Sequence, residues 1–177
     1  DIVSIVDTVS SMSAMPIMLD ELGIDCCIFG VQKAFALPPG LAVLTASDKA
    51  LERAKTVENR GYYFDFMEFA ANDEKDNTPS TPCISLIYGL DCQLQRIFAE
   101  GLEARWARHR SMADRTRSWA LAHGFELFAP EGARSVTLTS ITNSRGVDLA
   151  GIKKRLGEAG YAFDDGYGKL KGQVFRI

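Results

Sequence analysis

Alternating and β-branched apolar positions open the chain. The first stretch, DIVSIVDTVSS, passes from apolar residues into small polar ones, a pattern typical of a strand that enters a loop at Asp7. Residues 24–30, IDCCIFG, predict a second and buried strand that ends at Gly30. Residues 41–47, LAVLTAS, predict a third strand.

The connections between these segments set the directions of the strands. The linker VQKAFALPPG, residues 31–40, is too short for the crossover that joins parallel neighbours, so the third strand should run antiparallel to the second. If the first two strands are parallel members of an α/β sheet, both end at the same edge of that sheet.

Helical patterns follow. Ser47 precedes DKALERAKTV and predicts a capped short helix. Residues 71–82, ANDEKDNTPSTP, have the composition of a surface loop. From Ser85 onward, apolar residues recur at helical spacing and predict one long amphipathic helix, which runs into a second helical stretch that stops at Gly124. The recurring residues are Leu86, Leu90, Leu94, Ile97, Leu102 and Trp106.

The remaining residues change in style. Residues 135–141 predict a strand, residues 147–160 a helix with a glycine stop, and residues 173–177 a closing strand. The glycine-rich segment 164–172 lacks the order of a phosphate-binding loop and is interpreted as a mobile loop. Together these segments predict a small α+β unit whose boundary with the α/β part lies near residue 100.

Composition and charge exclude some partners. The chain has 177 residues, of which 46% are hydrophobic and 24% charged, with a net charge of −3 and a pI near 5.4. This balance gives no electrostatic reason to expect a nucleic acid or an anionic membrane as partner. No apolar run approaches the ~20 residues of a membrane helix and no cationic leader is visible, so we expect a cytoplasmic protein.

The cysteines and histidines predict no metal site. The four cysteines, at positions 26, 27, 83 and 92, form no CxxC pair and are expected to be reduced and buried. His109 and His123 lack partners at metal-ligand spacing and are interpreted as structural.

Lys33 is the residue that the apolar pattern does not explain. It follows the second strand and has apolar runs on both sides. A lysine buried there would lose solvation, favour its neutral form and become a nucleophile. A solvated loop lysine is the commoner interpretation, but the paired prolines in FALPPG stiffen the segment as a residue with a fixed position would require.

Asp7 is the second candidate. An aspartate after a strand is most often a turn residue. If the first two strands are parallel, however, Asp7 and Lys33 lie at the edge where open α/β sheets bind ligands. A carboxylate and an amine together suit pyridoxal 5′-phosphate, which has a basic ring nitrogen for the one and an aldehyde for the other.

Several segments together resemble one family. VDTVSSM, GIDCCIFGVQKAFALPPGLAVL, TPSTPCISLIYGL, EGLEARWARHR and the closing FRI resemble, in this order, the class V aminotransferases of fold type I, in particular the alanine/serine–glyoxylate aminotransferase group. The resemblance covers nearly the whole chain. It implies an α/β large domain with a mixed, mostly parallel sheet, of which residues 1–100 are the latter part, followed by an incomplete small α+β domain, residues 101–177.

The resemblance also implies roles for individual residues. Lys33 would form the aldimine with pyridoxal phosphate and later move a proton at the substrate Cα. Asp7 would hold the pyridine nitrogen protonated, Val9 would pack on the ring, and Gln32 would hydrogen-bond the phosphate. Arg176 would grip the substrate α-carboxylate through its bidentate guanidinium, although without the family a surface arginine at a strand end is the simpler interpretation.

The loop NTPSTP matches a family segment that reaches the cofactor phosphate of the neighbouring subunit. Thr78, Ser80 and Thr81 supply the hydroxyls, and the sequence does not choose among them. Asn77 stands where some members have a tyrosine, and Val31 stands where many have a serine, so two small polar contacts are in doubt. A shared site of this kind implies a homodimer.

The expected activity is transfer of an amino group from alanine or serine to glyoxylate or another 2-oxo acid. The resemblance further implies a preceding half with the phosphate loop and the ring-stacking aromatic residue, and these 177 residues alone should be inactive. One alternative is 2-aminoethylphosphonate transamination. Cysteine desulfuration is disfavoured because no cysteine follows Cys92. The alternative outside catalysis is a dimerisation or interaction module derived from the family.

Overall fold

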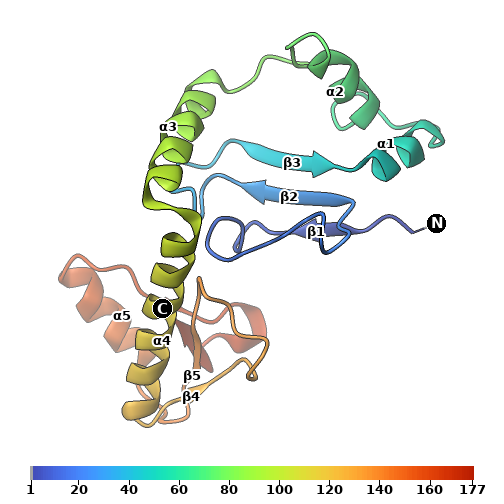
Figure 1. The fold of residues 1–177 in the computed structure, drawn as a ribbon. Helices are drawn as coiled ribbons and strands as arrows, with labels where there is room; N and C mark the ends of the chain where they lie inside the picture. Colours follow the sequence, from blue (N-terminus) through green and yellow to red (C-terminus); the bar gives the residue numbers. More distant parts are fainter. Residues whose placement is uncertain (1) are drawn as a thin grey trace. The chain divides into compact units, whose positions relative to one another are not determined.

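A computed structural model describes residues 2–177 (Figure 1). The described chain divides into two compact units, one up to Leu102 and one from Glu103 to Ile177. The first unit is α/β and the second is α+β, in agreement with the expected fold class. Each unit is described by itself.

The sheet of the first unit has the predicted directions. Strand β1 (Ile5–Asp7) is parallel to β2 (Cys26–Gly30), with Asp7 opposite Ile28. Strand β3 (Ala42–Ala46) is antiparallel to β2. Figure 1 shows β2 between its two neighbours. The antiparallel pairing inferred from the short linker 31–40 is thus confirmed, and the parallel arrangement considered for the first two strands is observed.

Side-chain caps begin the two short helices that follow β3. Helix α1 (Asp48–Lys55) starts after Ser47, whose hydroxyl accepts a backbone hydrogen bond of the first turn, as predicted. Helix α2 (Phe66–Asp73) starts after Asp65, whose carboxylate does the same. Helix α2 was not predicted from the sequence. Its last turn falls within the polar segment 71–82, where the charged residues hide the helical pattern.

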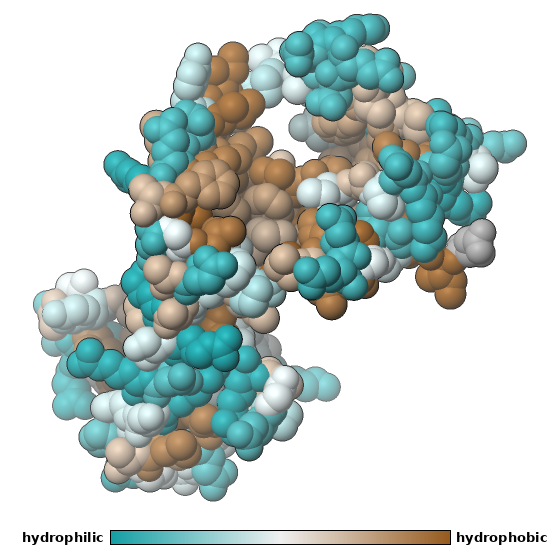
Figure 2. Space-filling model, in the orientation of Figure 1, coloured by the Kyte–Doolittle hydropathy of each residue, from teal (hydrophilic) through white to brown (hydrophobic). Residues whose placement is uncertain are grey.

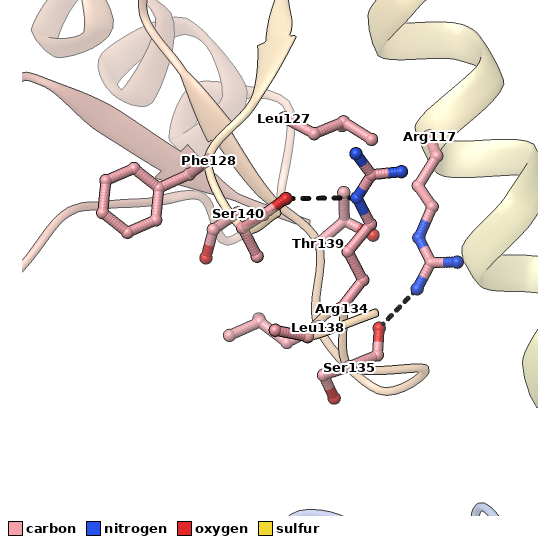
Figure 3. Close-up of a pocket in the computed structure, with 10 residues that line it drawn as sticks. Arg117, Leu127, Phe128, Arg134, Ser135, Leu138, Thr139 and Ser140 are labelled. Carbon is pink, nitrogen blue, oxygen red and sulfur yellow. Dashed lines mark hydrogen bonds between the residues drawn. The ribbon is translucent and has the colours of Figure 1, made fainter. Parts of the chain in front are cut away.

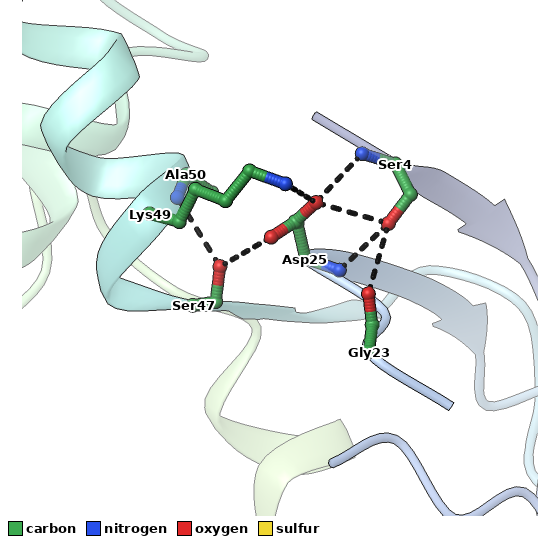
Figure 4. Close-up of polar contacts among 6 residues, drawn as sticks. All are labelled: Ser4, Gly23, Asp25, Ser47, Lys49 and Ala50. Carbon is green, nitrogen blue, oxygen red and sulfur yellow. Dashed lines mark hydrogen bonds and ion pairs between the residues drawn. The ribbon is translucent and has the colours of Figure 1, made fainter. Parts of the chain in front are cut away.

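Buried Asp25 ties the amino-terminal end of β2 to its surroundings (Figure 4). Its carboxylate accepts hydrogen bonds from Ser4 N at 2.9 Å and Ser47 Oγ at 3.1 Å, and pairs with Lys49 Nζ at 3.0 Å. The backbone hydrogen bond from Ser4 and the contact with Lys49 lower the pKa of Asp25 to about 2, against the opposing effect of burial. This cluster lies at the opposite end of β2 from Lys33, so we interpret it as structural.

The long helix predicted from Ser85 is interrupted. Helix α3 (Ile84–Glu100) ends at Gly101, which has a φ of +85°, and helix α4 (Leu102–Ala122) follows. Glycine adopts this φ without the steric cost that a side chain imposes. The apolar spacing continues across the break to Leu102, so periodicity alone could not reveal it. The predicted stop at Gly124 is confirmed, with a φ of +75°.

The second unit is built on an antiparallel sheet with the strand order β4-β5-β7-β6. Its core includes Phe125 and Phe175, whose rings meet edge to face with centroids 5.2 Å apart. Burial of large aromatic side chains of this kind stabilises small units strongly. The strands are β4 (Glu126–Leu127), β5 (Ser140–Thr142), β6 (Asp164–Asp165) and β7 (Val174–Arg176).

Predictions for this unit had mixed outcomes. Helix α5 (Leu149–Glu158) and the closing strand are confirmed. The strand predicted over residues 135–141 is wrong for most of its length, because Ser135 and Thr137 bond to each other locally at 2.9 Å and β5 starts only at Ser140. The glycine-rich segment 164–172 contains β6 and a short 3₁₀ helix, Gly168–Leu170.

Two of the four cysteines contradict the expectation of burial. Cys26 and Cys27 are buried in β2, whereas Cys83, which precedes α3, and Cys92, which lies within it, are exposed. An apolar sequence neighbourhood therefore predicts burial correctly for the two cysteines on the strand. It fails for the two cysteines at the helix, because a helix packed against a core buries only one of its faces. In the described part of the chain, no helix has the length and apolar character needed to cross a membrane.

Exposed apolar side chains gather on α3. Ile84, Ile87 and Tyr88 are exposed near its start, and Phe98 near its end. Figure 2 shows apolar residues along this helix on the visible face. Apolar surface of this kind is typical of regions that another protein surface covers.

Candidate functional site

The carboxyl edge of β1 and β2 holds the candidates from the first two strands. Asp7 is the last residue of β1, and Gly30 is the last residue of β2. Gln32 and Lys33 follow directly after Gly30. Because the two strands are parallel, both chain segments leave the sheet at the same edge. The structure therefore places Asp7 and Lys33 where the sequence pattern predicted.

A buried threonine fixes the turn after Asp7. Thr8 N donates to Ile28 O at 2.8 Å, and Thr8 Oγ1 donates to the same carbonyl at 3.0 Å and lies 3.1 Å from Cys27 Sγ. Asp7 Oδ1 then accepts from Val9 N at 2.9 Å. The Asp7 side chain is exposed and is oriented by its bond to Val9 N, while the bonds of Thr8 to Ile28 O tie the turn to β2. Sequence reasoning missed Thr8, which is polar where the apolar strand pattern ends.

The turn after β2 is anchored by apolar residues on each side of Lys33. Val31 and Phe35 are buried, and the Phe35 ring stacks on Phe29 with centroids 5.0 Å apart. Leu37 N donates to Val31 O at 3.1 Å and closes the turn. The backbone that carries Lys33 is therefore held by burial at two points and by a hydrogen bond.

Helix α3 supports the same turn from outside the sheet. Gln93 Nε2 donates to Phe35 O at 2.8 Å. Gly89 lets the helix approach closely, since a Cβ at this position would lie 3.1 Å from Leu37 Cδ2. Sequence reasoning missed Gln93. The sequence feature that could have revealed Gln93 is its place on the apolar face of the helix, one turn from both Leu90 and Ile97.

The expectation of a buried Lys33 is wrong in this structure. Val31 and Phe35 occupy the buried positions of the turn, so Gln32 and Lys33 are left exposed. The Gln32 amide folds over Gly30, where a Cβ would collide with it. Lys33 is thus an exposed amine on a rigid turn, and its fixed position follows from its neighbours rather than from its own burial.

The segment 77–82 forms an exposed loop with hydrogen bonds of its own. Asn77 Oδ1 accepts from Thr78 N at 2.9 Å, and Thr78 Oγ1 donates to Ser80 O at 2.7 Å. Tyr62 Oη donates to Pro79 O at 2.8 Å and attaches the loop to the chain before α2. The hydroxyl hydrogen of Thr78 is therefore used within the loop, so its oxygen can only accept from a ligand.

Arg176 lies at the end of β7 in the second unit. Its Nη2 pairs with Asp164 Oδ2 at 3.0 Å, and its Nε donates to Asp165 O at 3.3 Å. Its Cζ lies 4.1 Å from the centroid of the Tyr167 ring. Contact with Tyr167 raises the pKa of Arg176, and the charges of the two aspartates act in the same direction, while desolvation opposes them. The guanidinium is therefore held on one edge and one face.

A pocket of about 170 Å³ lies in the second unit beside α4 (Figure 3). Arg117 Nη2 donates to Ser135 O at 2.8 Å, and Arg117 Nη1 pairs with Asp114 at 3.0 Å. Arg134 Nε donates to Ala129 O at 3.1 Å. Both arginines thus hold the loop before β5, and the pocket contains none of the predicted site residues.

The donor set at the sheet edge fits pyridoxal phosphate. Lys33 offers an exposed amine on an anchored turn, and Asp7 offers an exposed carboxylate oriented by Val9 N. Gln32, the residue before Lys33, adds an amide. These are the groups that an aldehyde, a basic ring nitrogen and a phosphate would use. Lys33, Asp7 and Gln32 could therefore hold this cofactor at the edge.

Comparisons with known proteins agree with this chemistry. The family model described as aminotransferase class-V matches residues 1–168. The L-aspartate–glyoxylate aminotransferase of Paracoccus denitrificans is 39% identical over 175 residues, which cover 97% of this chain and 44% of that protein. The serine–glyoxylate aminotransferase of Hyphomicrobium methylovorum is 36% identical over 179 residues, with 97% and 44% covered.

A solved structure gives the same result. The alanine–glyoxylate aminotransferase from Nostoc sp. superposes with a TM-score of 0.88 at 29% identity and covers 99% of this chain and 48% of that one. The chain spans less than half the length of these three proteins. The family match includes the segments that carry Asp7, Lys33 and Thr78.

Proposed function

Because the chain belongs to the class V aminotransferase family, which implies pyridoxal phosphate as cofactor, we propose that the full-length protein is a transaminase acting on small substrates. It transfers an amino group from a small amino acid, alanine or serine, to glyoxylate or another 2-oxo acid. The observation that carries this proposal is the anchored turn that presents Lys33 at the same sheet edge as Asp7.

Asp7 and Lys33 carry the chemistry in this proposal. Bound pyridoxal phosphate supplies an aldehyde for an amine and a protonated ring that accepts the electron pair left at the substrate Cα. Asp7 would keep the proton on the ring nitrogen, and the turn held by Thr8 keeps Asp7 in position. Lys33 Nζ would hold the cofactor through its aldehyde and would take a proton from the substrate Cα once the substrate is bound.

The remaining candidate residues of the first unit bind the cofactor and orient it. Val9 packs on the ring, and Gln32 binds the phosphate. Ser80 and Thr81 donate to the phosphate in the partner subunit of a homodimer. The Thr78 hydroxyl can donate there as well only when it leaves its bond to Ser80 O.

Arg176 binds the α-carboxylate of the amino acid and of the 2-oxo acid. A guanidinium provides two parallel hydrogen bonds to a carboxylate, which fix the direction of the substrate as well as its affinity. A substrate without an α-carboxylate, such as 2-aminoethylphosphonate, would not depend on this contact in the same way.

A donor and acceptor screen tests the proposed function. The full-length protein with pyridoxal phosphate is assayed with alanine, serine, aspartate or 2-aminoethylphosphonate, and with glyoxylate or pyruvate. We expect alanine or serine with glyoxylate to react fastest, with activity lost in Lys33→Ala and KM raised in Arg176→Gln. Preference for 2-aminoethylphosphonate would favour that alternative. Absence of transamination with every pair would favour a non-catalytic module.

A further inference from the structure

The guanidinium of Arg176 already holds a carboxylate in this structure. Asp164 Oδ2 lies 3.0 Å from Arg176 Nη2, and Asp164 Oδ1 lies 3.5 Å from Lys153 Nζ. Each oxygen of Asp164 therefore faces a different cation. All three residues belong to the second unit, so the contact does not depend on the first.

Asp164 is not needed to position Arg176. The Nε of Arg176 is bound by the backbone carbonyl of Asp165, and the Tyr167 ring supports one face of the guanidinium. The side chain of Arg176 is 19% exposed, whereas that of Asp164 is 57% exposed. The arginine is thus held by neighbours other than Asp164, and Asp164 is the more exposed side chain of the pair.

We propose that Asp164 occupies Arg176 as an internal stand-in for the substrate carboxylate and thereby lowers the affinity for carboxylate substrates. This inference rests on the proposed function of Arg176. An arriving carboxylate takes Nη2, and Asp164 turns to Lys153, whose ammonium already lies beside its other oxygen. Since Asp164 is largely exposed, breaking its pair with Arg176 costs little, and the exchange is readily reversible.

The exchange predicts opposite effects for two substitutions. Asp164→Asn keeps the shape of the side chain and removes its charge, so carboxylate binding should tighten about two- to fivefold, the range that an exposed ion pair allows. Lys153→Gln removes the alternative partner of Asp164 and should weaken carboxylate binding. Asp165→Asn is the matched control, because it removes the neighbouring charge but keeps the backbone carbonyl that binds Nε.

The test uses propionate, which has the carboxylate of alanine and no amine. Its dissociation constant is measured by ligand-observed NMR on the full-length protein with pyridoxal phosphate, and KM and kcat for alanine are measured alongside. In Asp164→Asn we expect tighter propionate binding and a lower KM with kcat little changed. Asp165→Asn should change the propionate dissociation constant less than Asp164→Asn does.

Three outcomes would overturn the inference. Weaker or unchanged binding in Asp164→Asn would show that Asp164 does not compete with the ligand. An equal change of the propionate dissociation constant in Asp165→Asn would show that any nearby negative charge has this effect and that the contact between Asp164 and Arg176 is not its cause. If Arg176→Gln binds propionate as the unmodified protein does, the proposed role of Arg176 fails as well. The last result separates failure of the proposed function from failure of the inference alone.

Discussion

Single residues at the sheet edge act through their neighbours. Lys33 is exposed, and its position follows from burial of Val31 and Phe35. Asp7 is also exposed, and its turn is held by Thr8. The positions of these two side chains could be predicted from the sequence, because each lies where an apolar strand pattern ends. It could not predict the exposure of Lys33, because an apolar neighbourhood does not tell which side chains of a turn face inward.

The first prediction concerns Thr8. Thr8→Val should lower the free energy of unfolding by about 1 kcal/mol, because it removes the hydroxyl bond to Ile28 O and leaves the backbone bond to that carbonyl. Urea unfolding measures the change. Thr45→Val makes the same substitution at an exposed position of β3 and should have little effect. A similar loss in both variants would contradict the structural role of Thr8.

The second prediction concerns pH and Asp25. Because the pKa of Asp25 is lowered to about 2, its contribution is fully present above its unfolded pKa near ~3.9 and is lost as the pH falls through about 2. Asp25→Asn should therefore be less stable than the unmodified protein near neutral pH, and this difference should shrink between about pH 4 and about pH 2. Urea midpoints across this range measure it. If the difference stays constant, or if exposed Asp20→Asn behaves alike, the prediction fails.

Helices and strands are predictable from the sequence where linker length or side-chain pattern constrains them. They are not predictable where a backbone break or a local hydrogen bond ends them. The antiparallel pairing of β2 and β3 follows from the short linker between them. The break at Gly101 does not follow from the apolar pattern, which continues to Leu102. The loss of strand before Ser140 depends on local hydroxyl bonds between Ser135 and Thr137, which a two-residue period does not exclude.

The third prediction belongs to the loop 77–82. Tyr62→Phe removes the hydrogen bond to Pro79 O that attaches this loop to the rest of the first unit. If the loop binds the cofactor phosphate, the dissociation constant of pyridoxal phosphate should rise about two- to tenfold, as expected for loss of one hydrogen bond. Tyr63→Phe is the control, since Tyr63 is also exposed and its ring contacts Phe64. An unchanged dissociation constant in Tyr62→Phe would contradict the role of the loop.

At the scale of the whole molecule, the proposed roles are divided between the two units: Lys33 and Asp7 belong to the first unit, and Arg176 belongs to the second. The chain spans less than half of the relatives it resembles. The sequence showed family resemblance over nearly its whole length. Two contacts became visible only in the structure: the hydrogen bond from Gln93 to Phe35 O, and the ion pair between Asp164 and Arg176.

The most direct test of the central claim is covalent trapping at Lys33. The full-length protein is incubated with pyridoxal phosphate, reduced with borohydride, digested and mapped by mass spectrometry. We expect a reduced cofactor adduct on Lys33 that is absent in Lys33→Ala. Lys49, which pairs with Asp25 at the other end of β2, should remain unlabelled. An adduct on another lysine, or none at all, would show that Lys33 is not the residue that bonds to the cofactor.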